Sequence, residues 1–247
     1  MKGWQIFVHS IRMVLNNLGP AFRVSGILYL VQAVSQVMIL RNAPQYDIDG
    51  MPAPGPSGTG ELLLYLGLAV LASLWIAVGW HRFVLTGERP SSFLPRWHGA
   101  ELAAYLWTSV KVGVLVMVAL MLASGIGVLL SAFLPALIGG MMFGLFALGF
   151  YIFLRVGAAL PAAAMGEATG LRAAWRATGP HGGDIVAVTL LMLGGTLLAE
   201  LPTMLDGDAG SAISVIYTLV VNWFVTMFGI SVLTTIYGHC IQGRPID

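Results

Sequence analysis

The sequence predicts an all-α membrane protein that crosses the bilayer six times. Of its 247 residues, 57% are hydrophobic and only 9% are charged, against roughly 25% charged residues in an ordinary soluble domain. Uncharged stretches recur along the chain at about the 20 residues that one transmembrane helix needs. A soluble fold of this size cannot bury so much apolar surface, and a disordered chain needs far more charge. The net charge of +1 gives no indication of nucleic-acid binding.

Hydropathy places the six spans within one membrane domain, near 22–40, 62–85, 102–133, 136–160, 183–204 and 212–238. The uncharged stretch from Val112 to Leu154 is about twice as long as one span, and Pro135 marks its middle, so we interpret it as a tight hairpin. The segment 42–60 is rich in proline and glycine and has no helix or strand periodicity. We expect it to be a flexible outer loop.

The charges predict that both termini are cytoplasmic. Lys and Arg collect on the cytoplasmic side of short loops. With six spans, Arg41 is alone on the outer side, and the other basic residues share the inner side: Lys2, Arg12, Arg23, Arg82, Arg89, Arg96, Lys111, Arg155, Arg172, Arg176 and Arg244. A missed span would have mixed the two sides. We therefore expect a multi-pass protein of the bacterial inner (cytoplasmic) membrane.

Two segments outside the spans have the pattern of interfacial helices. Apolar residues recur at helical spacing in 1–20, from Trp4 to Leu18, and polar residues fall elsewhere on the wheel. This pattern is typical of an amphipathic helix in the membrane surface, and a helix packed onto the bundle is the alternative. A shorter cytoplasmic interfacial helix is expected at 168–179.

Short internal similarities predict three hairpins, each preceded by a cytoplasmic interfacial element. The segment 171–180 resembles 11–20, 181–185 resembles 98–102, and 237–245 resembles 80–90. Parallel repeats of this kind occur in membrane proteins. The alternative is that each helix entry at the inner surface independently favours Gly, Pro, Trp and a carboxylate.

Four segments together resemble a known family: WHRFVLTGERP (80–90), RVGAALPAAAMGE (155–167), LRAAWRATGP (171–180) and LTTIYGHCIQGRP (233–245). They look like a family of uncharacterised bacterial six-span membrane proteins, similar to the membrane domain attached to some glycerophosphodiester phosphodiesterases. The resemblance implies a six-helix inner-membrane module. It implies no activity, because in such fusions the hydrolysis belongs to a separate soluble domain.

Polar residues inside the membrane are the candidates for a solute path, because exposure to lipid is costly for them. In the first span, four such residues fall on one face: Ser25, Tyr29, Gln32 and Gln36. Asn222 lies near the middle of the sixth span. Either these residues line a path, or they form hydrogen bonds between helices.

Arg82, Arg155, Arg172 and Arg176 are the candidates for contact with a phosphate or lipid headgroup. A guanidinium can bind two phosphate oxygens at once. The alternative for Arg155 is a structural arginine that reaches for the interface. Pro161, which follows within two turns, is expected to kink or end the fourth span.

Two His–carboxylate pairs, His98 with Glu101 and His181 with Asp184, have the spacing of metal ligands on one helix face. Neighbouring glycines instead favour helix entries, where an acidic first turn suits the helix dipole. Glycines in the third and fourth spans predict close packing within the chain or, alternatively, a face for a second copy or a partner: Gly113, Gly125, Gly127, Gly140 and Gly144.

The sequence contains no GxSxG, HExxH, P-loop or CxxC motif. We therefore expect a non-catalytic module, with no catalytic residues, no cofactor and no metal: an accessory subunit, scaffold or assembly factor that binds membrane lipids. Another membrane protein or a second copy is an alternative partner. A small-solute or lipid transporter is the alternative function, and an intramembrane enzyme is a second one.

Overall fold

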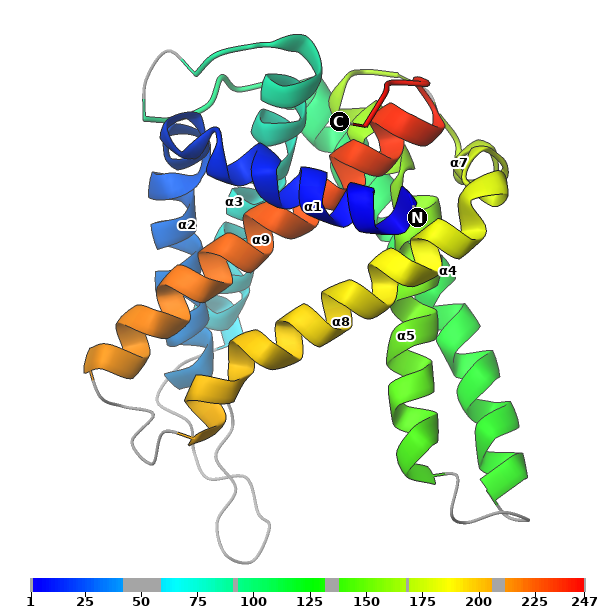
Figure 1. Cartoon of the computed structure of the whole chain (residues 1–247). Coiled ribbons are helices and arrows are strands. Elements are labelled where there is room, and N and C mark those ends of the chain that lie inside the picture. The colour runs from blue at the N-terminus through cyan, green and yellow to red at the C-terminus, as the bar shows by residue number, and fades with distance from the viewer. Residues whose placement is uncertain are drawn as a thin grey trace, which may run out of the picture.

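The chain folds into α-helices, two of them short, and the computed structural model describes residues 2–41, 59–90, 93–131, 138–167, 169–205 and 212–246 (Figure 1). In order, the α-helices are α1 (Lys2–Leu15), α2 (Leu18–Arg41), α3 (Thr59–Thr86), α4 (Gly99–Ser131), α5 (Ile138–Gly157), α6 (Ala159–Ala164), α7 (Leu171–Ala177), α8 (Gly182–Leu205) and α9 (Ala212–Cys240). A 3-10 turn (Gly179–His181) joins α7 to α8. No strand occurs in these ranges.

Within the described ranges, six helical segments are long and apolar enough to cross a membrane, and they begin at Leu18, Gly60, Gly99, Gly140, Gly179 and Ile213. Hydrocarbon offers no hydrogen-bond partners, so a spanning chain must satisfy its backbone within helices. The six-span, all-α prediction is therefore confirmed, and the protein is an integral membrane protein. The predicted loop 42–60 lies outside the described residues apart from the start of α3.

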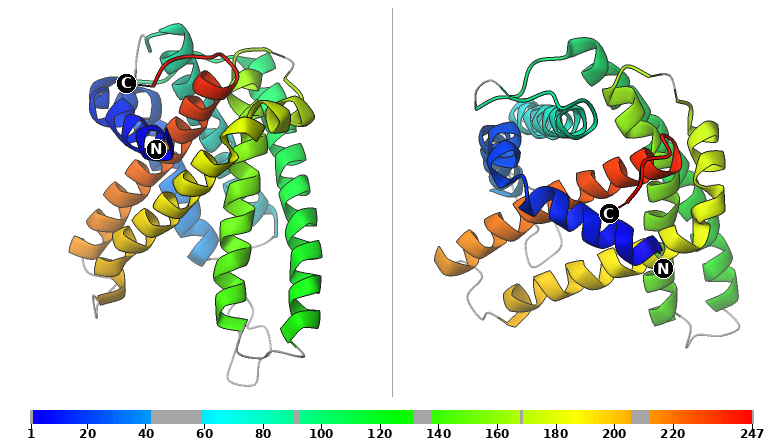
Figure 2. Two further views of the ribbon diagram at one scale, coloured as in Figure 1. Left: turned by 45° about the vertical axis from the view of Figure 1, so that its right-hand side comes forward. Right: turned by 45° about the horizontal axis from the view of Figure 1, so that its top comes forward.

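Both chain termini lie at one end of the molecule, together with the ends of α3 and α9 and the starts of α4 and α8 (Figures 1 and 2). We call this the terminal end and the opposite one the far end. The arrangement agrees with an even number of crossings. That the terminal end is cytoplasmic stays a prediction from charge.

Helix α1 packs across α8 and α9 (Figure 1). Its buried residues are Gly3, Ile6, Ser10 and Val14, while Trp4 is more than half exposed. Gly3 makes the close approach, because a Cβ there would lie 2.6 Å from the backbone oxygen of Asp184. Of the two alternatives for this segment, the structure shows the packed helix. It ends at Leu15, earlier than predicted, and α2 begins at Leu18.

Helix α5 ends where proline chemistry requires it. The ring of Pro161 clashes with the carbonyl four residues earlier in a continuous helix, and that residue is Gly157, the last of α5. The chain restarts as α6, whose six residues are all buried. The predicted kink in the fourth span is confirmed.

At the terminal end, a glycine in the left-handed conformation follows each of three helices. Gly87, Gly166 and Gly243 have φ values of 73°, 76° and 68° and follow α3, α6 and α9. Glycine adopts this conformation without the steric cost that a Cβ brings. The three turns support the predicted three-unit repeat, which stays a prediction.

The core lies at the terminal end, around the last turns of α9. Hydrogen bonds join this part of α9 to its neighbours: Trp80 Nε1 donates to Ser231 Oγ (2.8 Å), and Ser10 Oγ donates to Thr235 Oγ1 (3.0 Å). The fully buried His81 bonds through Nδ1 to Thr234 Oγ1 (2.8 Å). The hydroxyl of Thr234 already donates to a backbone carbonyl, so His81 is the donor in this pair.

The helix pairs differ in how closely they pack. Helix α2 packs along α3 and α4 along α5, whereas α8 and α9 contact each other only weakly. Both α8 and α9 lean away from α4 and α5 toward the far end (Figure 1). This divergence creates a large cavity between the described helices, which we call the main cavity.

Candidate functional site

The predicted polar stripe of α2 connects helices at its inner part. Ser25 Oγ accepts a hydrogen bond from Trp223 Nε1 (2.7 Å), and Tyr29 donates to the carbonyl of Leu219 (2.9 Å). Gln32 Oε1 is buried without a hydrogen-bond partner, and Gln36 is exposed. The first two contacts are the interhelical hydrogen bonds that the sequence left open as an alternative.

Asn222 does not join this stripe. It is exposed on α9, and its backbone carbonyl accepts a hydrogen bond from Thr226 (2.8 Å). Neither Asn222 nor the four stripe residues are among those that line the main cavity. The structure therefore does not bring the five polar candidates together around one space.

Arg82 belongs to a cluster of charges at the terminal end. Its Nε donates to Glu88 (2.8 Å), its Nη1 lies 3.6 Å from Glu101, and it donates to the carbonyl of Ala164 (3.2 Å) at the end of α6. His98 Nε2 lies 2.8 Å from the other oxygen of Glu88. Two carboxylates thus compensate the charge of Arg82.

Opposing effects act on the Glu88 carboxyl. Its partial burial by itself raises the pKa, but hydrogen bonds and positive charge from His98 and Arg82 outweigh this effect and hold the pKa below its ordinary value. Glu88 is therefore held as the carboxylate that joins the end of α3 to the start of α4.

Arg155 has different surroundings. The residue is only 8% exposed. It donates to Thr178 Oγ1 (3.2 Å), to Tyr151 Oη (3.1 Å) and to the carbonyl of Trp175 (2.6 Å). Its Cζ lies 3.6 Å from the centroid of the Trp175 ring, which is a cation–π contact. Arg155 fixes α7 against α5.

The four arginine candidates do not form one site. Arg82 contacts the end of α6, whereas Arg155 contacts the end of α7. Arg172 and Arg176 are exposed on α7. Arg155 is instead bound by Thr178 and by the carbonyl of Trp175 at the end of α7.

The two His–carboxylate pairs lie at the starts of α4 and α8. His98 pairs with Glu88, and Glu101 faces Arg82. Asp184 accepts a hydrogen bond from the backbone N–H of Gly3 (3.0 Å). Within the described ranges, no group of three or more His, Cys, Asp or Glu is placed to hold a metal ion.

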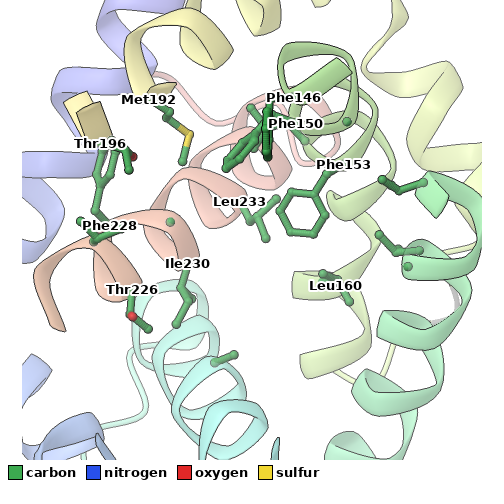
Figure 3. A pocket seen from close by; sticks show the side chains of 18 of the residues that line it. Phe146, Phe150, Phe153, Leu160, Met192, Thr196, Thr226, Phe228, Ile230 and Leu233 are labelled. Atoms are coloured by element: carbon green, nitrogen blue, oxygen red, sulfur yellow. The ribbon is translucent and has the colours of Figure 1, made fainter. Parts of the chain in front are cut away.

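The main cavity lies between α3, α4, α5, α8 and α9 and has a volume of about 1470 Å³. Phe7 and Ile11 of α1 and Leu160 of α6 border it at the terminal end. In Figure 3, Phe153 of α5 and Leu233 of α9 point toward the same space. None of the described residues that line it is charged.

The hydroxyl groups in the cavity wall are largely occupied. Ser73, Ser109, Ser124 and Thr226 each donate to a backbone carbonyl of their own helix, at 2.7–2.9 Å. Such bonds leave mainly hydrocarbon facing the space. The cavity therefore suits an apolar molecule and offers little to a polar solute.

The sequence did not reveal this cavity, although it held one signal. Small residues four apart face it from two walls, as the pairs Ser109–Gly113 and Gly195–Ala199. A Cβ at Gly113 would meet nothing within 4 Å, and the same holds at Gly125, Gly140 and Gly144. The prediction that these glycines pack helices of this chain together is wrong for these four. It holds for Gly127, which lies against Met141 of α5.

Comparisons with known proteins identified no relative: no family model, no curated protein and no solved structure matches the chain. The resemblance to the six-span family therefore stays a prediction.

Proposed function

We propose that the protein is a non-catalytic module of the bacterial inner membrane that holds the hydrocarbon chains of a membrane lipid in its main cavity. In this role it acts as an accessory or scaffolding component. The observation that carries the proposal is the uncharged 1470 Å³ cavity between membrane-spanning helices. Ordinary small-molecule sites are about 300–1000 Å³, so this space has room for a larger, chain-like occupant.

The shape of the cavity supports a lipid chain. Its lining on α4 runs from Tyr105 to Ser124, which corresponds to about 28 Å of helix. The hydrocarbon core of a bilayer is about 30 Å thick. An occupant of this site lies along the membrane normal, as acyl chains do.

Binding in such a cavity depends on fit. Lipid tails are as apolar as the cavity wall, so the hydrophobic effect gives little preference for the site over the bilayer. Selective retention then comes from van der Waals packing against the wall. A side chain that fills the cavity is expected to displace the lipid without changing the polarity of the protein.

A partner's transmembrane helix is the second candidate occupant. The pairs Ser109–Gly113 and Gly195–Ala199 favour it, because small residues four apart let helices approach closely. The four lining hydroxyls named above are already bonded within their own helices, so they offer a partner helix little interhelical hydrogen bonding. The lining therefore favours the lipid.

Native mass spectrometry of the protein extracted in mild detergent tests the proposal. Gly113→Leu fills the cavity, and Gly125→Leu is the matched control on the same helix, because both glycines have open space and only Gly113 lines the cavity. We expect wild type and Gly125→Leu to retain bound lipid and Gly113→Leu to lose it. Equal lipid in all three would overturn the proposal, and a co-purified protein lost only from Gly113→Leu would establish the helix instead.

A further inference from the structure

Arg155 is a buried cation without a counter-ion. Among the described residues, no carboxylate oxygen lies within 4.0 Å of its guanidinium, and its partners are a hydroxyl of Thr178, the hydroxyl of Tyr151 and a backbone carbonyl. Buried charges in proteins are ordinarily paired, because removing an ion from water is costly. The dipole of α7, whose C-terminal turn Arg155 contacts, compensates at most about half a charge.

Arg82 differs from Arg155 in its counter-ions, because it is also partly buried but its charge is neutralised. Arg82 also bonds to the end of a neighbouring helix, at the Ala164 carbonyl, but Glu88 and Glu101 neutralise it. Arg155 is more deeply buried and lacks this neutralisation. Its environment therefore favours an anion.

The guanidinium of Arg155 keeps binding capacity. Arginine has five N–H donors. The three bonds to protein use one N–H on each of Nε, Nη1 and Nη2, which leaves one N–H on each terminal nitrogen. Two such donors suit two oxygens of one phosphate group.

Arg155 lies toward the terminal end of its candidate span, which runs from Gly140 to Ala164. It is 17 residues beyond Ile138, where α5 begins at the far end, and this corresponds to about 26 Å of helix. With the start of α5 placed at one boundary of the hydrocarbon core, which is about 30 Å thick, the guanidinium comes close to the boundary at the terminal end. Residues of α5 directly before it, Phe153 and Leu154, line the cavity.

Arg155 also lies at the terminal end of the contact between α5 and α8, which we call the seam. A Cβ on Gly179 would lie 3.5 Å from Arg155 Nη2, and a Cβ on Gly182, the first residue of α8, would lie 3.4 Å from the Tyr151 hydroxyl. Below this point, α8 leans away from α5 (Figure 1), and Met192 and Thr196 of α8 face the cavity (Figure 3). Arg155 itself does not line the cavity, but it follows directly on Phe153 and Leu154, which do, so we place the headgroup of a lipid whose chains lie in the cavity at this seam.

We infer that Arg155 binds the phosphate group of the lipid whose hydrocarbon chains occupy the main cavity. The inference rests on the proposed function and adds the chemical class of the ligand, a phospholipid whose phosphate lies at the terminal end. The exposed Arg172 and Arg176 attract anionic headgroups to this surface. Arg155 is the residue that distinguishes a phospholipid from an uncharged lipid.

The test compares lipids that differ only in the phosphate. Delipidated wild-type protein in detergent is titrated with dioleoyl phosphatidic acid, with dioleoylglycerol and with inorganic phosphate, and bound ligand is counted by native mass spectrometry. A charged hydrogen-bond contact contributes enough for a preference of about tenfold or more for phosphatidic acid over dioleoylglycerol. Equal binding of the two lipids would overturn the inference, and inorganic phosphate binding as tightly as phosphatidic acid would overturn its assignment to a lipid.

Variants assign the preference to one residue. Arg155→Gln is expected to reduce the ratio between the two lipids to about one, and Arg155→Lys, which keeps the charge but loses the two-pronged geometry, to reduce it partly. Arg82→Gln removes the same charge from a neutralised position and is expected to leave the ratio unchanged. A ratio that survives Arg155→Gln would show that another cation binds the phosphate. If Arg155→Gln does not fold, the wild-type titrations and Arg155→Lys still decide.

The outcomes separate this inference from the proposed function. One outcome is that Gly113→Leu loses both lipids while wild type binds phosphatidic acid and dioleoylglycerol equally. It would retain the cavity as a lipid site and reject Arg155 as the phosphate-binding residue. A phosphate preference that depends on Arg155 but is insensitive to Gly113→Leu would reject the cavity as the place of the chains and retain the phosphate site.

Discussion

Replacing Gly3 with alanine is expected to separate α1 from α8. A Cβ at this position would lie 2.6 Å from the backbone oxygen of Asp184 and 2.7 Å from the Cβ of Ala187. Neither atom is the end of a flexible side chain, so the helices must move apart. That movement also breaks the hydrogen bond from the Gly3 N–H to the Asp184 carboxylate, which is 3.0 Å long.

The expected cost is about 1.5–5 kcal/mol. Overpacking of this kind costs about 1–3 kcal/mol, and a hydrogen bond to a charged group contributes about 1.5–3 kcal/mol. Alanine returns up to about 1 kcal/mol through its higher helix propensity. The sum remains clearly destabilising.

The single cysteine of the chain, Cys240, provides the assay, because it is partly buried near the end of α9. A thiol-reactive dye in detergent solution reports unfolding when this side chain becomes accessible. Gly19→Ala is the matched control, since Gly19 is likewise the second residue of its helix and has nothing within 4 Å of its Cβ position. Equal stability of the two variants would refute the packing of α1 against α8 and favour the alternative of a helix in the membrane surface.

Three further predictions concern local contacts. The pKa of Glu88 lies below its ordinary 4.5. The ionised Glu88 carboxylate therefore stabilises the fold fully above that pH, and this stabilisation is lost as the pH falls through the lowered pKa. The stability difference between wild type and Glu88→Gln, measured by dye-monitored melting from neutral pH downwards, should shrink only in acid. Ser25 Oγ accepts a hydrogen bond from the buried indole N–H of Trp223, so Ser25→Ala leaves that N–H without a partner and should cost about 1–3 kcal/mol in the same assay. Gln36→Ala, at an exposed position, should have almost no effect. Gly166→Ala forces a side chain into a φ of 76° and should cost about 1–2 kcal/mol relative to Gly170→Ala, which has open space and an ordinary φ.

The sequence predicted the features that the membrane itself imposes. Spans are legible because hydrocarbon excludes charge over a fixed thickness. The end of α5 at Gly157 was predictable from Pro161, because that effect acts across one helical turn. The packing of α1 was not decided, because an apolar face looks the same whether it meets lipid or another helix.

The cavity and the difference between the arginines depend on contacts that sequence patterns do not contain. The cavity follows from the divergence of α8 and α9 from α4 and α5 toward the far end (Figure 1). Arg82 is neutralised by Glu88 across the turn at Gly87 and by Glu101 from α4. Arg155 has no such carboxylate in the described part of the chain. Both arginines look alike in sequence, since each is a basic residue near the end of a span.

Photo-crosslinking would show whether a phospholipid chain lies in the main cavity. A phospholipid with a diazirine in its acyl chain is incorporated into membranes that contain the protein, irradiated, and the modified residues are located by peptide mass spectrometry. We expect labelling concentrated on cavity residues such as Phe150, Phe153 and Phe228, and loss of this labelling in Gly113→Leu. Labelling confined to outward residues such as Leu129 and Leu198, which are exposed and lie outside the cavity lining, would contradict this expectation.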